Sequence, residues 1–164
     1  MSDFVLFDEE FQLIKDVIAR LKADAQAKVV FIVDKNGQQI AAQGEIENLD
    51  TTSLASLTAG NVAATDGLAR LIGEKEFSIL FHEGEKDNIH ISIVAQRVIL
   101  VVIFDERSSL GLVRLRVKKA SGELNDVFAR IMSKVERERT AAGAAFESPF
   151  AEITDDDIDS LFSE

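Results

Sequence analysis

Few residues in this chain have a type and spacing suited to catalysis or metal binding. The chain has no cysteine, and its two histidines, His82 and His90, lie eight positions apart without further ligands that the sequence marks out. No phosphate-binding loop of the form G-x-x-x-x-G-K-[ST] is present, and no Ser/His/Asp arrangement stands out. We therefore predict no catalytic residue, no metal, no cofactor and no bound nucleotide. Both histidines are expected at the surface, His82 in a loop and His90 on a strand.

Charge is distributed unevenly along the 164 residues, whose net charge is −11. Residues 147–164 contain seven acidic residues and no Lys or Arg, so the rest of the chain carries 22 acidic and 18 basic residues. This acidity disfavours binding to nucleic acid phosphates, and the absence of Trp and Tyr removes good stacking platforms. One basic cluster interrupts the pattern, and two interpretations of it stay open: a solvated helix face, or a surface for an acidic partner or the chain's own tail. The cluster consists of Arg114, Arg116, Lys118 and Lys119.

Apolar runs in the sequence reach the length of a strand but not that of a membrane span. The longest comprises residues 98–104, far short of the roughly 20 residues that cross a bilayer. The first residues also lack the basic and apolar regions of a secretory signal. We expect a cytoplasmic protein without direct membrane insertion.

Hydrophobic periodicity and turn residues predict three helices and five strands in one α+β domain, residues 1–139. The first helix carries Phe4, Phe7 and Phe11 on its apolar stripe and is capped by Ser2 or Asp3. Asn36-Gly37 predicts a tight hairpin with positive φ at both residues. The expected helices span about 4–21, 51–72 and 110–139, with Ser108 or Ser109 capping the last. The expected strands span 29–33, 39–43, 77–81, 89–95 and 98–104.

The second predicted helix begins after Asp50, ends at Gly73 and carries two stripes. Its leucines are expected to form the core face. Its small residues, four apart, are expected to let another backbone approach closely, although ordinary packing of the helix on the sheet is an equal alternative. The leucines are Leu54, Leu57, Leu68 and Leu71, and the small residues are Ala55, Ala59, Ala63 and Gly67, with Thr58 and Gly60 adjacent.

The chain ends in a small-residue segment, 140–149, that predicts a flexible linker, followed by an acidic segment, 150–164. Thr154 and the three aspartates after it suit a helix start, because an N-cap and negative charges meet the positive end of the dipole. A disordered solubilising tail would not need apolar residues at helical spacing. We therefore predict a recognition segment that folds on a partner. Its apolar residues are Phe150, Ile153, Ile158, Leu161 and Phe162.

Four stretches of the chain resemble the roadblock/dynein light chain family, and within it the bacterial MglB-like proteins. They are KVVFIVDKNG (28–37), DTTSLASLTAGN (50–61), SLGLVRLR (109–116) and SPFAEI (148–153). The resemblance covers nearly the whole chain. It implies a roadblock-type sandwich of order α-β-β-α-β-β-β-α, with a five-stranded antiparallel sheet, the long second helix on one face and the first and third helices on the other.

The resemblance also implies a function. MglB-like proteins are homodimeric activators of MglA, a small Ras-like GTPase in bacterial cell polarity and gliding motility, and they bind its switch regions in the cytoplasm or at a cell pole. The implied GTPase-binding residues are Thr58, Ala59, Ala63, Gly67, Phe150, Ile153, Ile158, Leu161 and Phe162. The implied dimer interface comprises Ala55, Ala59, Asn61, Val62, Phe77 and Ile79.

Three alternatives remain at this point. An exposed arginine such as Arg97 or Arg107 could act as an arginine finger, but the resemblance favours activation by positioning of the GTPase's own groups. A non-catalytic scaffold or adaptor subunit of a GTPase or motor complex would bind without raising the hydrolysis rate. A small-molecule sensor ranks last, because no convergent polar set is visible in the apolar core.

Overall fold

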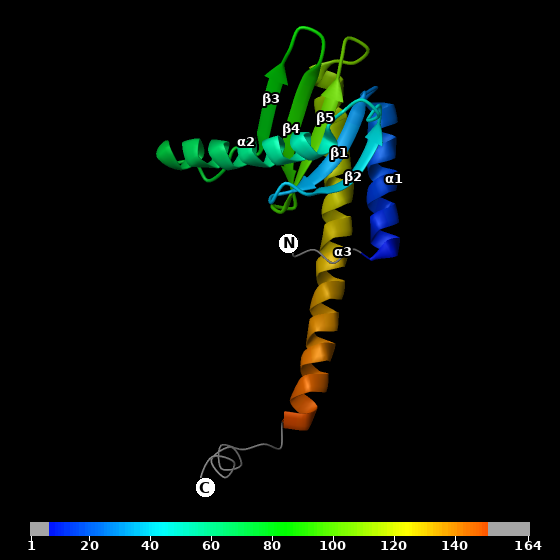
Figure 1. Cartoon of the computed structure of the whole chain (residues 1–164), viewed down its shortest axis with the longest axis vertical. Coiled ribbons are helices and arrows are strands. Elements are labelled where there is room, and N and C mark those ends of the chain that lie inside the picture. Colours follow the sequence, from blue (N-terminus) through cyan, green and yellow to red (C-terminus); the bar gives the residue numbers. More distant parts are fainter. Residues whose placement is uncertain (1–6, 151–164) are drawn as a thin grey trace.

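The structure is a computed structural model in which residues 7–150 are described, and it contains the predicted eight elements in the predicted order (Figure 1). Five antiparallel strands form one sheet in the order β2-β1-β5-β4-β3. The α+β class and the element order are thereby confirmed. The elements are α1 (Asp8–Asp24), β1 (Val29–Asp34), β2 (Gln39–Gly44), α2 (Thr51–Leu71), β3 (Ile79–Glu83), β4 (Asn88–Val94), β5 (Val98–Phe104) and α3 (Leu110–Phe150).

The sheet separates two apolar layers, with α2 on one face and α1 and α3 on the other (Figure 1). Along β5, Leu100 and Val102 pack beneath α1 and α3, whereas Ile99 and Val101 pack beneath α2. Successive side chains of a strand point to opposite faces, so a central strand covered on both sides must be apolar throughout. Every residue of β1 and β5 is buried.

The β1–β2 hairpin corrects the predicted two-residue turn. Gly37 has a φ of +93°, but Asn36 does not adopt a positive φ. The Asp34 carboxylate accepts hydrogen bonds from the backbone N–H groups of Asn36 and Gln38, at 2.9 and 3.0 Å. The Gly37 N–H donates to the Asp34 carbonyl at 3.1 Å, so the glycine alone provides the left-handed residue.

Helix α1 begins later than predicted, because Phe7 is its N-cap in extended conformation and lies outside the helix. The proposed caps Ser2 and Asp3, and also Phe4, lie outside the described residues. Three acidic residues fill the first turn, where the helix dipole favours them. One of these, Glu10, is fully buried, and the Nζ atom of Lys134 on α3 lies 2.6 Å from its Oε1 atom. The hydrogen bond from Lys134 holds the pKa of Glu10 below its usual value.

Helix α3 is longer than predicted. The Ser109 hydroxyl caps its start by accepting from the Leu112 N–H at 3.2 Å, as expected. The helix then continues past Arg139 to Phe150, and it extends well beyond the sheet (Figure 1). Its predicted end at Arg139 is therefore wrong, and the segment 140–149 is helical. Alanine is the strongest helix former, and four alanines among residues 140–145 offset the single glycine.

The face of β4 that carries His90 is buried, contrary to the prediction of a surface histidine. His90 is 1% exposed and Ser92 is 5% exposed, because this face of β4 lies toward α3. The alternation of polar and apolar residues in β4 is real, but its polar side is covered by a helix rather than by solvent. The preceding strand, β3, also begins two residues later than predicted, at Ile79.

Candidate protein-binding surface

Helix α2 packs on the sheet through small side chains. Ala55 is 1% exposed, and Ala59 and Val62 are also buried beneath the helix. The predicted leucine core face is wrong for three of its four members: Leu54 packs against this core, but Leu57, Leu68 and Leu71 are 72%, 60% and 83% exposed. Small residues let a helix lie close to a sheet whose own face already carries large side chains, such as Phe31. The first residues of the small-residue stripe, Ala55 and Ala59, thus lie on the inner face of α2.

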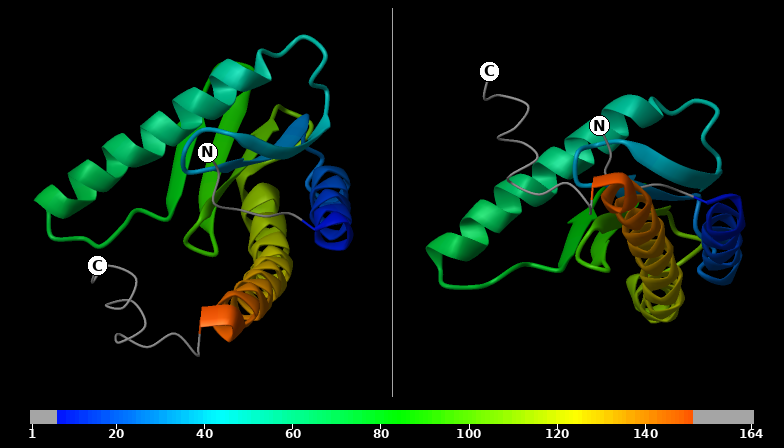
Figure 2. Two further views of the ribbon diagram at one scale, coloured as in Figure 1. Left: turned by 60° about the horizontal axis from the view of Figure 1, so that its bottom comes forward. Right: turned by 90° about the horizontal axis from the view of Figure 1, so that it is seen from below.

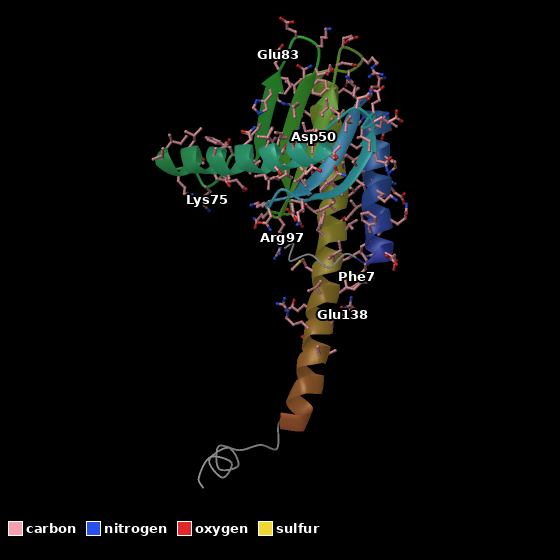
Figure 3. The ribbon with its side chains drawn as sticks, in the orientation of Figure 1. Phe7, Asp50, Lys75, Glu83, Arg97 and Glu138 are labelled. Carbon is pink, nitrogen blue, oxygen red and sulfur yellow. The ribbon has the colours of Figure 1, made fainter. Side chains whose placement is uncertain are left out.

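The start of α2 is fixed by a local cap, as predicted. The Asp50 carboxylate accepts from the Ser53 N–H at 3.1 Å and from the Ser53 hydroxyl at 2.6 Å. These bonds stabilise the charged form and lower the pKa of Asp50. Figure 3 shows Asp50 at the end of α2 that lies over the middle of the sheet. The cap therefore satisfies the Ser53 donors in the first turn of α2.

The other end of α2 extends past β3 and leaves the sheet, as the views in Figures 1 and 2 agree. Its exposed apolar side chains include Leu68, Leu71 and Ile72, at 60%, 83% and 68% exposure. Beneath it, β3 pairs only with β4 among the described residues, so its outer edge is open there. Exposed apolar side chains beside an unpaired strand edge are typical of a protein interface.

The outer side of α2 also contains an open strip of small residues. Ala63 is exposed and Gly67 is half-buried, and a Cβ added at Gly60 or Gly67 would meet nothing within 4 Å. These positions let a partner's backbone come close to the helix. The structure thus separates the predicted contact residues: Ala63 and Gly67 are accessible, whereas Thr58 and Ala59 are buried within the chain.

The predicted dimer-interface residues also divide into buried residues and accessible ones. Ala55, Ala59 and Val62 pack in the core of their own chain. Asn61 is half-buried and forms a hydrogen bond with the Nε2 atom of His82 at 2.8 Å. Phe77 is half-buried just before the open strand, and Ile79 is 52% exposed on it. The prediction from sequence missed the outward leucines of α2. The only signal for them in the sequence was that the leucine stripe and the small-residue stripe could not both face the sheet.

The predicted tail contacts lie almost wholly beyond the part of the chain that the structure describes. Phe150 is the last residue of α3, and the remaining four are outside the described residues. These four are Ile153, Ile158, Leu161 and Phe162.

The two candidate finger arginines differ in their surroundings. Arg107 donates from Nε to Asp105 at 3.0 Å, and its Nη2 atom lies 3.5 Å from a Glu45 oxygen. The Asp105 carboxylate raises the pKa of Arg107, and the guanidinium in turn lowers the pKa of Asp105. Arg97 is exposed in the turn between β4 and β5 (Figure 3). Of the two, only Arg97 has no acidic partner among the residues that the structure describes.

The basic cluster of α3 does not form one surface. Arg114 and Lys118 line a groove beside β4, whereas Arg116 and Lys119 line a small cleft against α1. A helix turns about 100° per residue, so neighbours in sequence point in different directions. Among the described residues, no group of three or more His, Asp or Glu side chains could hold a metal ion. None of the described helices is both long and apolar enough to cross a membrane.

Comparison with known proteins gives the family. Residues 13–104 match the model of the Roadblock/LC7 domain. This chain belongs to the Roadblock/LC7 family. Among solved structures, an MglB from Myxococcus xanthus is similar to this chain, with 63% identity over 77% of this chain and 96% of that one and a TM-score of 0.74.

Two other MglB structures resemble this roadblock chain at lower identity. The gliding protein MglB of Thermus thermophilus is 29% identical over 77% of this chain and 96% of that one, with a TM-score of 0.73. An MglB described as having a tetrameric arrangement is 27% identical over 80% and 98%, with a TM-score of 0.75. No curated protein sequence matches the chain.

Proposed function

We propose that this roadblock protein is a homodimeric regulator that binds a small MglA-like Ras-family GTPase and stimulates GTP hydrolysis without an arginine finger. The observation that carries the proposal is the 63% identity to the Myxococcus xanthus MglB, which extends over 96% of that chain. The exposed apolar end of α2 supports it, because such a surface suits a partner protein. As in MglB-like proteins, the chain acts in the cytoplasm, with enrichment at a cell pole.

The proposed dimer joins two copies at the open edge of β3 and the projecting end of α2. Pairing of the edges would satisfy backbone groups that are unpaired in the single chain. The same contact would cover Leu68, Leu71 and Ile72, which are apolar and exposed. Phe77 and Ile79 lie at the same edge and would take part. Each copy supplies an identical patch, as a two-fold interface requires.

The GTPase is proposed to dock on the outer strip of α2 around Ala63 and Gly67. Small side chains let the switch loops approach the helix, and contact with one arrangement of those loops would stabilise it. The network that binds Arg107 to Asp105 and Glu45 favours this mechanism over insertion of that arginine. The acidic segment 150–164 is proposed to contact the GTPase at a second place, away from the nucleotide.

Phosphate release from a GTP-loaded MglA-like GTPase tests the proposal. Titration with the full chain should raise the rate in proportion to the bound fraction. Arg97→Ala should leave the stimulated rate unchanged. A complex that forms without any increase in rate would instead identify a scaffold subunit. Loss of stimulation in Arg97→Ala with unchanged affinity would show that the chain does supply a finger.

A further inference from the structure

A groove between β4 and α3, on the face of the sheet opposite α2, contains polar groups that the rest of the fold leaves unsatisfied. It has a volume of ≈ 440 Å³, which is within the range of small-molecule sites. We call it the β4–α3 groove. Its lining includes His90, Ser92, Arg114, Val117, Lys118 and Ser121.

The inner part of the β4–α3 groove is polar and uncharged. His90 and Ser92 are buried, and neither ring nitrogen of His90 nor the Ser92 hydroxyl has a hydrogen-bond partner in the described structure. Burial, together with the nearby charge of Arg114, lowers the pKa of His90, so its ring is neutral at physiological pH. A neutral imidazole offers one donor and one acceptor, and a hydroxyl offers both. Buried groups of this kind are normally paired, so an unpaired set requires an explanation.

The outer part of the β4–α3 groove is cationic. Arg114 and Lys118 are exposed, and neither has an acidic partner within the part of the chain described. No acidic residue of the described chain lines the groove, while Val117 and Ile79, the latter also a proposed dimer contact, provide apolar walls. Long basic side chains can move at small cost, so they do not block access to the inner part. The arrangement therefore combines a cationic entrance, apolar walls and a neutral hydrogen-bonding floor.

We propose that the β4–α3 groove binds a small organic anion that also carries a neutral hydrogen-bonding group. The anionic end, a carboxylate or a phosphate monoester, contacts Arg114 and Lys118. The neutral end reaches His90 and Ser92 and supplies the hydrogen bonds that they lack. Because the groove opens on the opposite face of the sheet from α2, this site does not depend on the proposed GTPase contact.

The test uses nuclear magnetic resonance of the full chain, in which the ring signals of His90 report binding and those of His82 serve as an internal control. The probes are benzoate, 4-hydroxybenzoate and phenyl phosphate at millimolar concentration, with sodium chloride at matched ionic strength. We expect saturable shifts of the His90 signals alone. Comparison of benzoate with phenyl phosphate identifies the preferred anion.

Two kinds of variant make the result specific. Arg114→Gln should weaken binding by roughly tenfold, as expected for loss of a hydrogen bond to a charged group, whereas Lys119→Gln on the α1 side should have no effect. Ser92→Ala should reduce the advantage of 4-hydroxybenzoate over benzoate. The proposal is overturned if no probe gives a saturable shift, if sodium chloride gives the same shifts, or if Arg114→Gln binds like the unmodified chain.

Discussion

The two faces of the sheet are covered in opposite ways. Under α1 and α3, large side chains such as Ile14, Leu124 and Phe128 point inward and are almost completely buried. Under α2 the inward residues are mainly small, and leucines such as Leu71 point outward. One face therefore completes its core within a single chain, while the other leaves apolar surface over. The difference predicts that stability is concentrated on the first face and binding of partner proteins on the second.

The same substitution on the two faces should give the largest contrast. Leu124→Ala removes a fully buried side chain and should lower the free energy of unfolding by about 2–5 kcal/mol. Leu71→Ala removes an 83% exposed side chain and should change the stability of a single chain by less than about 0.5 kcal/mol. Chemical denaturation at several chain concentrations measures both.

The concentration series distinguishes folding from association. The loss of unfolding free energy in Leu124→Ala should be the same at every chain concentration, because the cavity that the substitution leaves lies inside one chain. Any loss in Leu71→Ala should appear only at concentrations where the unmodified chain is dimeric. Equal, concentration-independent losses in the two variants would contradict the division between the faces.

Partner binding should depend on the small side chains of the outer strip of α2, and not simply on the charge that a substitution adds to the helix. Ala63→Arg places a bulky cation where the proposed GTPase docks, and we expect its affinity to fall at least about tenfold. Ala64→Arg is the matched control, since it adds the same group to an exposed neighbour that points about 100° away around the helix. Calorimetric titration with the GTPase compares them. Normal binding by Ala63→Arg would move the docking site elsewhere.

His90 gives the α1/α3 face one weak point, and acid should reveal it. Burial lowers its pKa in the folded chain, so below the ordinary value of about 6.5 the unfolded chain takes up a proton that the folded chain does not. Stability should therefore fall as the pH drops below about 6.5. Arg114 opposes protonation, and Lys118 is the other charged residue that lines the groove.

Denaturation of the unmodified chain and of His90→Gln between about pH 7.5 and 5.5 isolates this effect, because these limits lie about one unit either side of that value. The variant should lose less stability over this interval, because it has no imidazole to protonate there. Identical pH profiles would show that another group is responsible.

The sequence predicted the order of the elements and the family, because periodicity, caps and turn residues act locally. The Asp50 and Ser109 caps are cases in point. The prediction failed where the packing of a neighbouring element decides which side of a helix or strand is buried. Either stripe of α2 could have faced the sheet, and only the size of side chains already on the sheet selects the alanines. His90 was misplaced for the same reason, since a strand's polar side is covered or exposed according to where α3 lies.

The candidate site could be predicted only in part. Ala63 and Gly67 lie where a partner can reach them, but Ala55 and Val62 are used by the chain's own core. The outward leucines were read as core because hydrophobicity alone does not distinguish a core from an interface. The groove beside His90 was not foreseen, because its residues come from β3, β4 and α3, which are far apart in the sequence.

The smallest expected contrast concerns the caps that begin the two long helices. Helix α3 packs against α1 and the sheet along much of its length, whereas α2 packs chiefly through small residues and should depend more on its cap. Asp50→Ala should therefore lower the melting temperature by about 2 to 4 °C, and Ser109→Ala by less. Amide hydrogen exchange should be faster in the first turn of α2 than in that of α3.

The Asp50 effect should also depend on pH in a defined direction. The pKa of Asp50 is lowered in the folded chain, so its contribution is complete above the ordinary value of about 4 and is lost as the pH falls through the folded value. Asp50→Asn, which can still cap, should lie between Asp50→Ala and the unmodified chain at neutral pH. A larger drop in melting temperature from Ser109→Ala than from Asp50→Ala would mean that α2 is held mainly by its packing. The two faces would then differ in the residues that they expose, and not in how firmly their helices are fixed.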